Sequence, residues 1–293
     1  MTCGLSSLLG RAIDLVVPVV EDDAPWATPW KGSRAAAELA AEETVHPAPE
    51  TGSWPWALAP LIARLALRVG AEEAKVLRLA LDTDGTSYGA DVLCRSVLET
   101  LSLAWWLLEP TIASPNRRAR AMLYRWQSAR QTETAIRHLE RQMQDYPVGY
   151  GEVPEQVERD AASFGITFER AAGRTACQGE VWPSYSERVA LLVSSVWPQT
   201  RLPYAVLSAV AHGELLGLTR NVGSKPGEAA SLRPARGANW TWLWHDTYLA
   251  AGALLFSAER AADFLGLKGS MTAVQSGKAA IQEALEALRS GPE

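Results

Sequence analysis

Apolar residues recur along most of this chain at intervals of three and four, the spacing that places them on one face of a helix. The helices that this pattern predicts span residues 33–46, 54–69, 71–81, 90–108, 114–145, 183–197, 203–218, 239–265 and 272–289. The two-residue alternation that is typical of half-buried strands is missing. The sequence therefore predicts an all-α fold, built as a multi-helix bundle.

Prolines and glycines divide the chain into segments. A Pro-rich stretch at 47–55 follows the first predicted helix, so we expect residues 1–53 to form a looser N-terminal arm or cap and residues 54–293 to form the bundle. Gly70 is expected to end the helix that begins at residue 54, because glycine commonly follows the last helical residue. Between 149 and 182 we expect shorter, more polar helices, and this segment is a candidate insertion.

The composition limits the class of protein. Of 293 residues, 47% are apolar and 21% are charged, as in a globular protein with a sizeable core. The net charge of −5 argues against a dedicated binder of duplex DNA, whose basic face would dominate the total. The three cysteines are scattered and form no C-x-x-C motif, which favours a reducing, cytoplasmic location.

Neither a signal peptide nor a membrane segment is expected. The apolar stretch at 12–20 is interrupted by Asp14 and has no basic run before it. The longest uncharged apolar runs, near 100–108 and 247–258, are shorter than the roughly 20 residues that span a bilayer.

Two of the apolar segments carry polar side chains at four-residue spacing. Arg95 and Glu99 form one row, and Tyr204, Ser208 and His212 form the other. On a helix each row lies along one face. The apolar surroundings predict that both faces are buried, and buried polar groups need partners.

If the two helices face each other, the rows bring together an acid, a base and an anion-binding group. Neutral His212 would then accept a proton, Arg95 would bind a phosphate, and Glu99 would fix the tautomer of the imidazole. Tyr204 and Ser208 would position the substrate. The alternative is structural, because an Arg–Glu pair at this spacing often satisfies itself and a lone histidine on an apolar face often bonds a neighbouring helix.

These motifs also carry a resemblance to a known group of proteins. The R-x-x-x-E motif of Arg95 and Glu99 runs into an apolar Trp-containing helix, a basic helix follows, and then comes Y-x-x-x-S-x-x-x-H-G from Tyr204 to Gly213. This order resembles uncharacterised bacterial helical proteins related to the HEPN-like bundles. The resemblance covers about residues 54–265.

The resemblance implies a cytoplasmic protein that acts on RNA or a nucleotide in bacterial defence, by acid–base chemistry without a metal or another cofactor. It also implies a homodimer. Active HEPN ribonucleases carry an arginine followed four to six residues later by a histidine, whereas Arg201 and Arg236 stand eleven and nine residues before His212 and His245. A non-catalytic, HEPN-like interaction protein is therefore the alternative.

Tryptophan is unusually frequent, with 12 Trp against 4 Phe. Trp105, Trp244 and His245 are candidates to line a pocket for an apolar or aromatic small molecule, as in a small-molecule-binding or biosynthetic protein. Simple core packing of large aromatic rings is the alternative.

Two further patterns have an ordinary explanation. The arginines between Arg117 and Arg141, with interleaved aromatic residues, suit single-stranded RNA, but such a run more often pairs with acidic neighbours. Glu43 and His46 match half of the Glu-x-x-His motif of di-iron bundles, and no second copy exists. We therefore predict no metal site.

Overall fold

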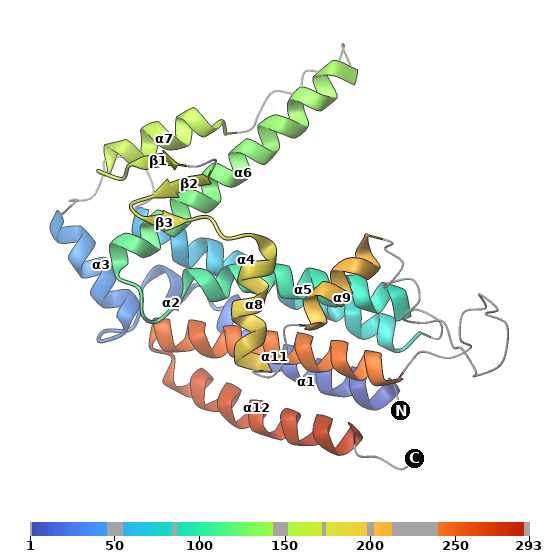
Figure 1. Cartoon of the computed structure of the whole chain (residues 1–293). Coiled ribbons are helices and arrows are strands. Elements are labelled where there is room, and N and C mark those ends of the chain that lie inside the picture. The colour runs from blue at the N-terminus through green and yellow to red at the C-terminus, as the bar shows by residue number, and fades with distance from the viewer. Residues whose placement is uncertain are drawn as a thin grey trace. The chain divides into compact units, whose positions relative to one another are not determined.

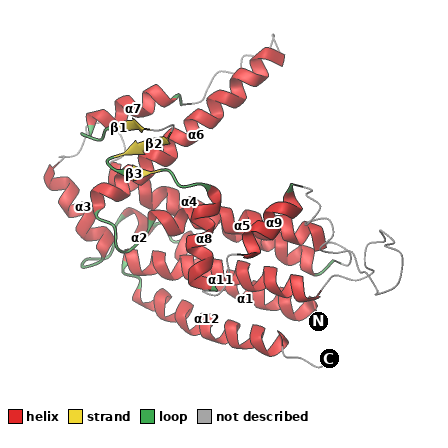
Figure 2. Ribbon diagram, viewed as in Figure 1, coloured by secondary structure: helices red, strands yellow, loops and turns green. Residues whose placement is uncertain are grey.

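The computed structural model describes residues 2–45, 55–83, 87–142, 152–171, 174–197, 202–212 and 240–289, and these residues are mostly helical, as the sequence predicts (Figures 1 and 2). The chain divides into two compact units. Unit 1 comprises Met1–Ala36, Ala63–Leu108 and Ser184–Glu293, and unit 2 comprises Ala37–Ile62 and Glu109–Pro183. The predicted single bundle over 54–293 is thus two units, and the candidate insertion at 149–182 belongs to unit 2.

Unit 1 is built around one apolar helix. Its helices are α1 (Thr2–Glu21), α2 (Ala24–Ala27), α5 (Ser87–Leu107), α8 (Tyr185–Val196), α9 (Leu202–Ala211), α11 (Trp240–Leu265) and α12 (Lys268–Arg289). It also holds the first turn of α3 (Arg34–Val45) and most of α4 (Pro55–Leu81). Helix α11 packs against α1, α5, α8 and α12, which explains why it is apolar nearly all round.

The N-terminal residues do not form a loose arm. Helix α1 is packed against α11 and α12, and Leu5, Leu9, Ala12 and Val16 are fully buried at the spacing of one helix face. The indole N–H of Trp26 then donates to the carbonyl of Val19 at 2.8 Å, which ties the following turn to the helix. The apolar stretch that begins the chain is therefore part of the core of unit 1.

Gly70 does not end a helix, because α4 runs through it as one element from Pro55 to Leu81. A Cβ atom added at Gly70 would lie 2.5 Å from Cδ2 of Leu101 on α5. The glycine therefore allows α4 and α5 to approach closely, and its place in the sequence reflects packing rather than a helix terminus.

Unit 2 packs a long helix against a short helix and a small sheet. Its elements are α6 (Ser114–Gln142), α7 (Pro154–Ser163), β1 (Phe168–Ala171), β2 (Arg174–Cys177) and β3 (Glu180–Val181), together with the rest of α3 and the first part of α4. The strands form an antiparallel sheet in the order β1-β2-β3, drawn in yellow in Figure 2. The core of the unit consists of buried residues of α6, α7 and β2, among them Leu123, Trp126, Val157 and Cys177.

Of the short polar helices that the sequence predicts between 149 and 182, α7 is present, and the sheet lies between 168 and 181, where the sequence predicts no strand. Its strands have two to four residues, too few to show a two-residue alternation. Residues Gln178 and Gly179 connect β2 to β3, and both have positive φ, at 49° and 80°. This geometry is that of a type I′ hairpin turn. The dipeptide typical of this turn is Asn-Gly, so Gln-Gly predicts it less clearly.

No helix within the described ranges is long and apolar enough to cross a membrane.

Candidate functional site

Helices α5 and α9 pack side by side in unit 1 and bring the two polar rows together (Figure 1). The Arg95 guanidinium lies between the other two groups. Its Nε donates to Oε1 of Glu99 at 2.6 Å, and its Nη1 lies 3.2 Å from Nε2 of His212. The side chains of Arg95 and Glu99 are 18% and 23% exposed, so the pair is largely withdrawn from water.

The contact with Arg95 determines the state of the imidazole. A guanidinium only donates hydrogen bonds, so a hydrogen bond across this contact requires Nε2 of His212 to be the acceptor, which selects the tautomer that carries its proton on Nδ1. Arg95 thereby fixes the tautomer, a role that the sequence pattern predicts for Glu99. Glu99 acts one step further away, by holding the guanidinium that meets the ring.

His212 is exposed, which differs from the expected burial of its row. It follows the last residue of α9, and its N–H donates to the carbonyl of Ser208 at 3.0 Å. Leu207 and Ala209 of α9 are buried, so the apolar surroundings cover the middle of the helix and not its C-terminal end. The end of the helix presents the imidazole to solvent.

The remaining members of the second row are only partly defined. Ser208 lies one turn before His212 and is half-buried. The side chain of Tyr204 and all of Gly213 lie outside the described residues, as does His46 of the incomplete di-iron motif.

Glu73 of α4 is a neighbour that sequence patterns do not single out. Its Oε1 accepts a hydrogen bond of 2.6 Å from the hydroxyl of Ser96, the residue after Arg95. Its Oε2 is buried and has no partner among the described atoms. Glu73 stands among charged residues on what looks like a solvated face, so only the tertiary contact with α5 reveals it.

The aromatic residues at the start of α11 form a packed cluster in unit 1. Trp244 is 4% exposed, donates from its indole N–H to the carbonyl of Leu285 at 2.6 Å, and stacks on Tyr248 with ring centroids 5.2 Å apart. Burial, reinforced by the charge of Glu286, raises the pKa of Tyr248. Trp197 stacks on His245 at 5.0 Å. These rings fill the space between one another, as in core packing.

Trp105 does not join that cluster. Its ring contacts Phe256 at 6.4 Å, and the guanidinium of Arg260 lies 3.0 Å from its centroid and donates to its carbonyl. Phe256 stands twelve residues after Trp244 on the same helix, which corresponds to about 18 Å. Trp105 therefore does not share a pocket wall with Trp244 and His245.

Four arginines in the first half of α6 are engaged in ion pairs within unit 2. The pairs are Arg117 with Glu38, Arg118 with Glu42, Arg120 with Glu109 and Glu180, and Arg125 with Glu152 and Asp160. The hydrogen bond with Glu152 is the main cause of a raised pKa for Arg125. The pairing with acidic neighbours is what the structure shows for these residues, and no RNA-binding role is needed to explain them.

Among the residues that the structure describes, no three histidine, cysteine, aspartate or glutamate side chains lie close enough together to hold a metal ion. Comparisons of the chain with protein-family models, with curated proteins and with solved structures found no match.

Proposed function

We propose that this protein cleaves RNA, or a related nucleotide, by metal-independent acid–base chemistry with His212 as the base and Arg95 as the phosphate-binding group. The observation that carries the proposal is the 3.2 Å contact between Nη1 of Arg95 and Nε2 of the exposed His212. A base and a fixed cation at this distance suit a reaction in which a hydroxyl is deprotonated beside a phosphate.

The same contact explains how a substrate would activate the base. A phosphate oxygen accepts strongly from a guanidinium, so a bound phosphate competes with Nε2 for the Nη1 donor. When Nη1 turns to the phosphate, the lone pair of Nε2 becomes available to a hydroxyl. The resting hydrogen bond thus keeps the imidazole oriented until the phosphate arrives.

The reaction that fits these groups is an internal transesterification. The 2′-hydroxyl of a ribose loses its proton to Nε2 of His212, its oxygen forms a bond to the adjacent phosphorus, and the bond from phosphorus to the 5′ oxygen breaks. The leaving oxygen takes a proton from water, and the imidazolium returns its proton to the hydroxide that remains. The products are a 2′,3′-cyclic phosphate and a 5′-hydroxyl, and Arg95 stabilises the charge on the phosphate throughout.

Glu99 serves as a positioning residue in this scheme. Its carboxylate holds Nε of Arg95 and so orients the guanidinium beside the imidazole. The resemblance to HEPN-like bundles supports the choice of RNA as substrate and adds a cytoplasmic, homodimeric protein of bacterial defence to the proposal.

The test is cleavage of a mixed-sequence RNA in the presence of EDTA. We expect the wild type to cleave, and we expect His212→Ala and Arg95→Ala to lose at least 100-fold in rate, because each removes a group that acts on the reacting phosphate. Arg68→Ala, which removes an exposed arginine of α4, is the control and should keep full activity. RNA left intact by the wild type, or cut equally by His212→Ala, would refute the proposal.

The role of Glu99 needs a separate comparison. Glu99→Gln keeps an oxygen that accepts from Arg95 and should retain activity within about tenfold, whereas Glu99→Ala should lose most of it. Equal losses in the two variants would show that Glu99 does more than position Arg95.

A further inference from the structure

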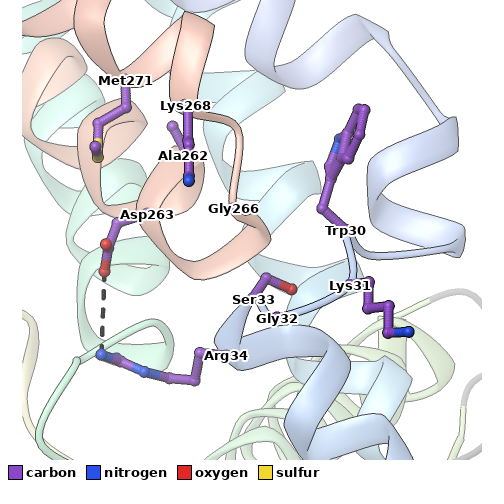
Figure 3. A pocket seen from close by; sticks show the side chains of 10 residues that line it. All are labelled: Trp30, Lys31, Gly32, Ser33, Arg34, Ala262, Asp263, Gly266, Lys268 and Met271. Atoms are coloured by element: carbon purple, nitrogen blue, oxygen red, sulfur yellow. Dashed lines mark ion pairs between the residues drawn. The ribbon is translucent and has the colours of Figure 1, made fainter.

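A second candidate site lies in unit 1, where the turn before α3 meets the junction of α11 and α12. A pocket of about 440 Å³ opens there (Figure 3). Its volume is within the range of small-molecule sites, which runs from about 300 to 1,000 Å³. The residues that line it are Trp30, Lys31, Gly32, Ser33, Arg34, Ala262, Asp263, Gly266, Lys268 and Met271.

The charge of the lining is opposite to that of the whole protein. Lys31, Arg34 and Lys268 carry three positive charges and Asp263 carries one negative charge, so the lining has a net charge of +2 in a chain of −5. Figure 3 shows the ends of the Arg34 and Asp263 side chains pointing toward each other, joined by a dashed line. Their closest atoms are 4.0 Å apart, which leaves the guanidinium only weakly engaged.

Arg34 has an unmet donor. Its Nη1 is buried and has no hydrogen-bond partner among the atoms that the structure describes. A buried, unpaired donor of a charged group costs free energy. The Arg34 side chain as a whole is 34% exposed, so its accessible part is available to an anionic ligand.

Two helices begin at the pocket and add to its positive character. Ser33 caps α3, and its hydroxyl accepts from the N–H of Ala36 at 3.0 Å, while α12 begins at Lys268. The first turns of helices carry partial positive charge and N–H groups without an intrahelical acceptor. A Cβ atom at Gly266 would lie 2.8 Å from that of Ser33, so this glycine allows the two turns to meet.

Trp30 supplies a flat apolar surface at the rim. Trp30 is 63% exposed, which is unusually high for a tryptophan. Figure 3 shows its ring beside the pocket. A planar ring bound against the indole would regain this area.

We propose that the pocket binds a phosphomonoester that carries an aromatic ring, the chemistry of a nucleoside monophosphate. Arg34 and Lys268 hold the phosphate, Trp30 stacks on the base, and Asp263 offers an acceptor to a hydroxyl of the sugar. This site is distinct from the Arg95–His212 contact and does not depend on it.

Calorimetric titration of the full chain separates the contribution of the phosphate contacts to binding from that of the contact with Trp30. We expect adenosine monophosphate to bind with a stoichiometry of one at this site, ribose 5-phosphate to bind at least tenfold more weakly, and inorganic phosphate to bind more weakly still. The double variant Arg34→Gln/Lys268→Gln should raise the dissociation constant of adenosine monophosphate at least 30-fold. Trp30→Ala should bind adenosine monophosphate about as weakly as the wild type binds ribose 5-phosphate. Arg11→Gln, which removes an exposed cation of α1, is the matched control and should bind like the wild type.

His212→Ala separates this inference from the proposed function. We expect it to keep the binding event that the double variant loses. No binding of adenosine monophosphate at millimolar concentration, unchanged binding by the double variant, or loss of binding in His212→Ala would overturn the site. Equal affinity for inorganic phosphate and adenosine monophosphate would overturn the role of Trp30.

Discussion

Arg95 is the residue on which the candidate site depends, because it uses different nitrogens for its two partners. Nε engages Glu99 and Nη1 engages His212. The planar fork of a guanidinium fixes the angle between these donors, whereas the single nitrogen of a lysine cannot serve both partners in the same geometry.

We therefore predict that Arg95→Lys is almost as inactive as Arg95→Ala in RNA cleavage, although it keeps the positive charge. Its unfolding free energy should change by less than about 1 kcal/mol, because a lysine ammonium four residues before Glu99 still pairs with the carboxylate. Initial rates and urea unfolding of both variants measure the two effects. Activity in Arg95→Lys near that of the wild type would mean that charge alone is needed.

Cys177 is a residue whose environment predicts a pH dependence. It is fully buried in unit 2, and this burial, with smaller contributions from Glu169 and Glu180, raises the pKa of its thiol to about 12 from 9.0. In the unfolded chain the thiol ionises first as the pH rises. Its contribution to stability is therefore complete below pH 9 and is lost between pH 9 and 12.

Urea unfolding at pH 8 and pH 10 tests this. We predict that the difference in unfolding free energy between wild type and Cys177→Ala shrinks by about 1 kcal/mol over this interval, since one such site changes stability by up to about 1.4 kcal/mol per pH unit. Comparing the two proteins at each pH cancels the titration of other groups. A difference that stays constant would show that Cys177 ionises alike in the folded and unfolded chains.

Of the contacts that Arg95 makes in the candidate site, the sequence predicts the one with Glu99 but not the one with His212. The four-residue spacing of Arg95 and Glu99 is enough to predict their pairing, because helix geometry alone places them together. The contact with His212 joins residues 117 positions apart and depends on how α5 packs against α9. The exposed position of His212 likewise follows from where α9 ends rather than from its apolar neighbours.

Helices α4 and α5 illustrate how packing overrides a local rule. Glycine at position 70 favours a helix end by propensity, yet α4 continues through it because the missing side chain lets Leu101 of α5 approach. Sequence periodicity predicts the two halves of α4 correctly, and only the partner helix explains why they are one element. The β2–β3 turn shows the same limit, since its strands are stabilised by packing on α6.

We predict that Gly70→Ala lowers the unfolding free energy by about 1–3 kcal/mol, because its Cβ would overlap the fully buried Leu101. Gly89→Ala in α5 is the control, since nothing lies within 4 Å of its added Cβ, and it should be neutral or slightly stabilising. Thermal unfolding of both variants provides the comparison. Equal stability would indicate that Leu101 moves aside without cost.

The whole chain carries a net charge of −5, and in unit 2 the buried arginines of α6 are matched by acidic partners. Arg117 is 1% exposed, pairs with Glu38 and donates to the carbonyls of Glu109 and Ile112. Burial of this kind requires every donor to be satisfied, so the pair specifies how unit 2 is assembled. Composition alone cannot tell such buried arginines from solvated ones.

We predict that Arg117→Met destabilises the protein by about 3–5 kcal/mol, because Glu38 would remain largely buried without its cation. Arg137→Met on the same helix removes an arginine whose side chain is 70% exposed and should cost less than about 1 kcal/mol. Urea unfolding of the two variants measures the contrast. Similar losses would mean that burial does not govern these pairs.

The measurement that tests the central claim most directly is the chemistry of the ends left on RNA after incubation with the protein in EDTA. Transfer of the 2′-hydroxyl proton to His212 predicts 2′,3′-cyclic phosphate and 5′-hydroxyl ends, formed by the wild type and absent with His212→Ala. Intact RNA, or fragments with 3′-hydroxyl and 5′-phosphate ends, would contradict the assignment of Arg95 and His212 as a base beside a phosphate site.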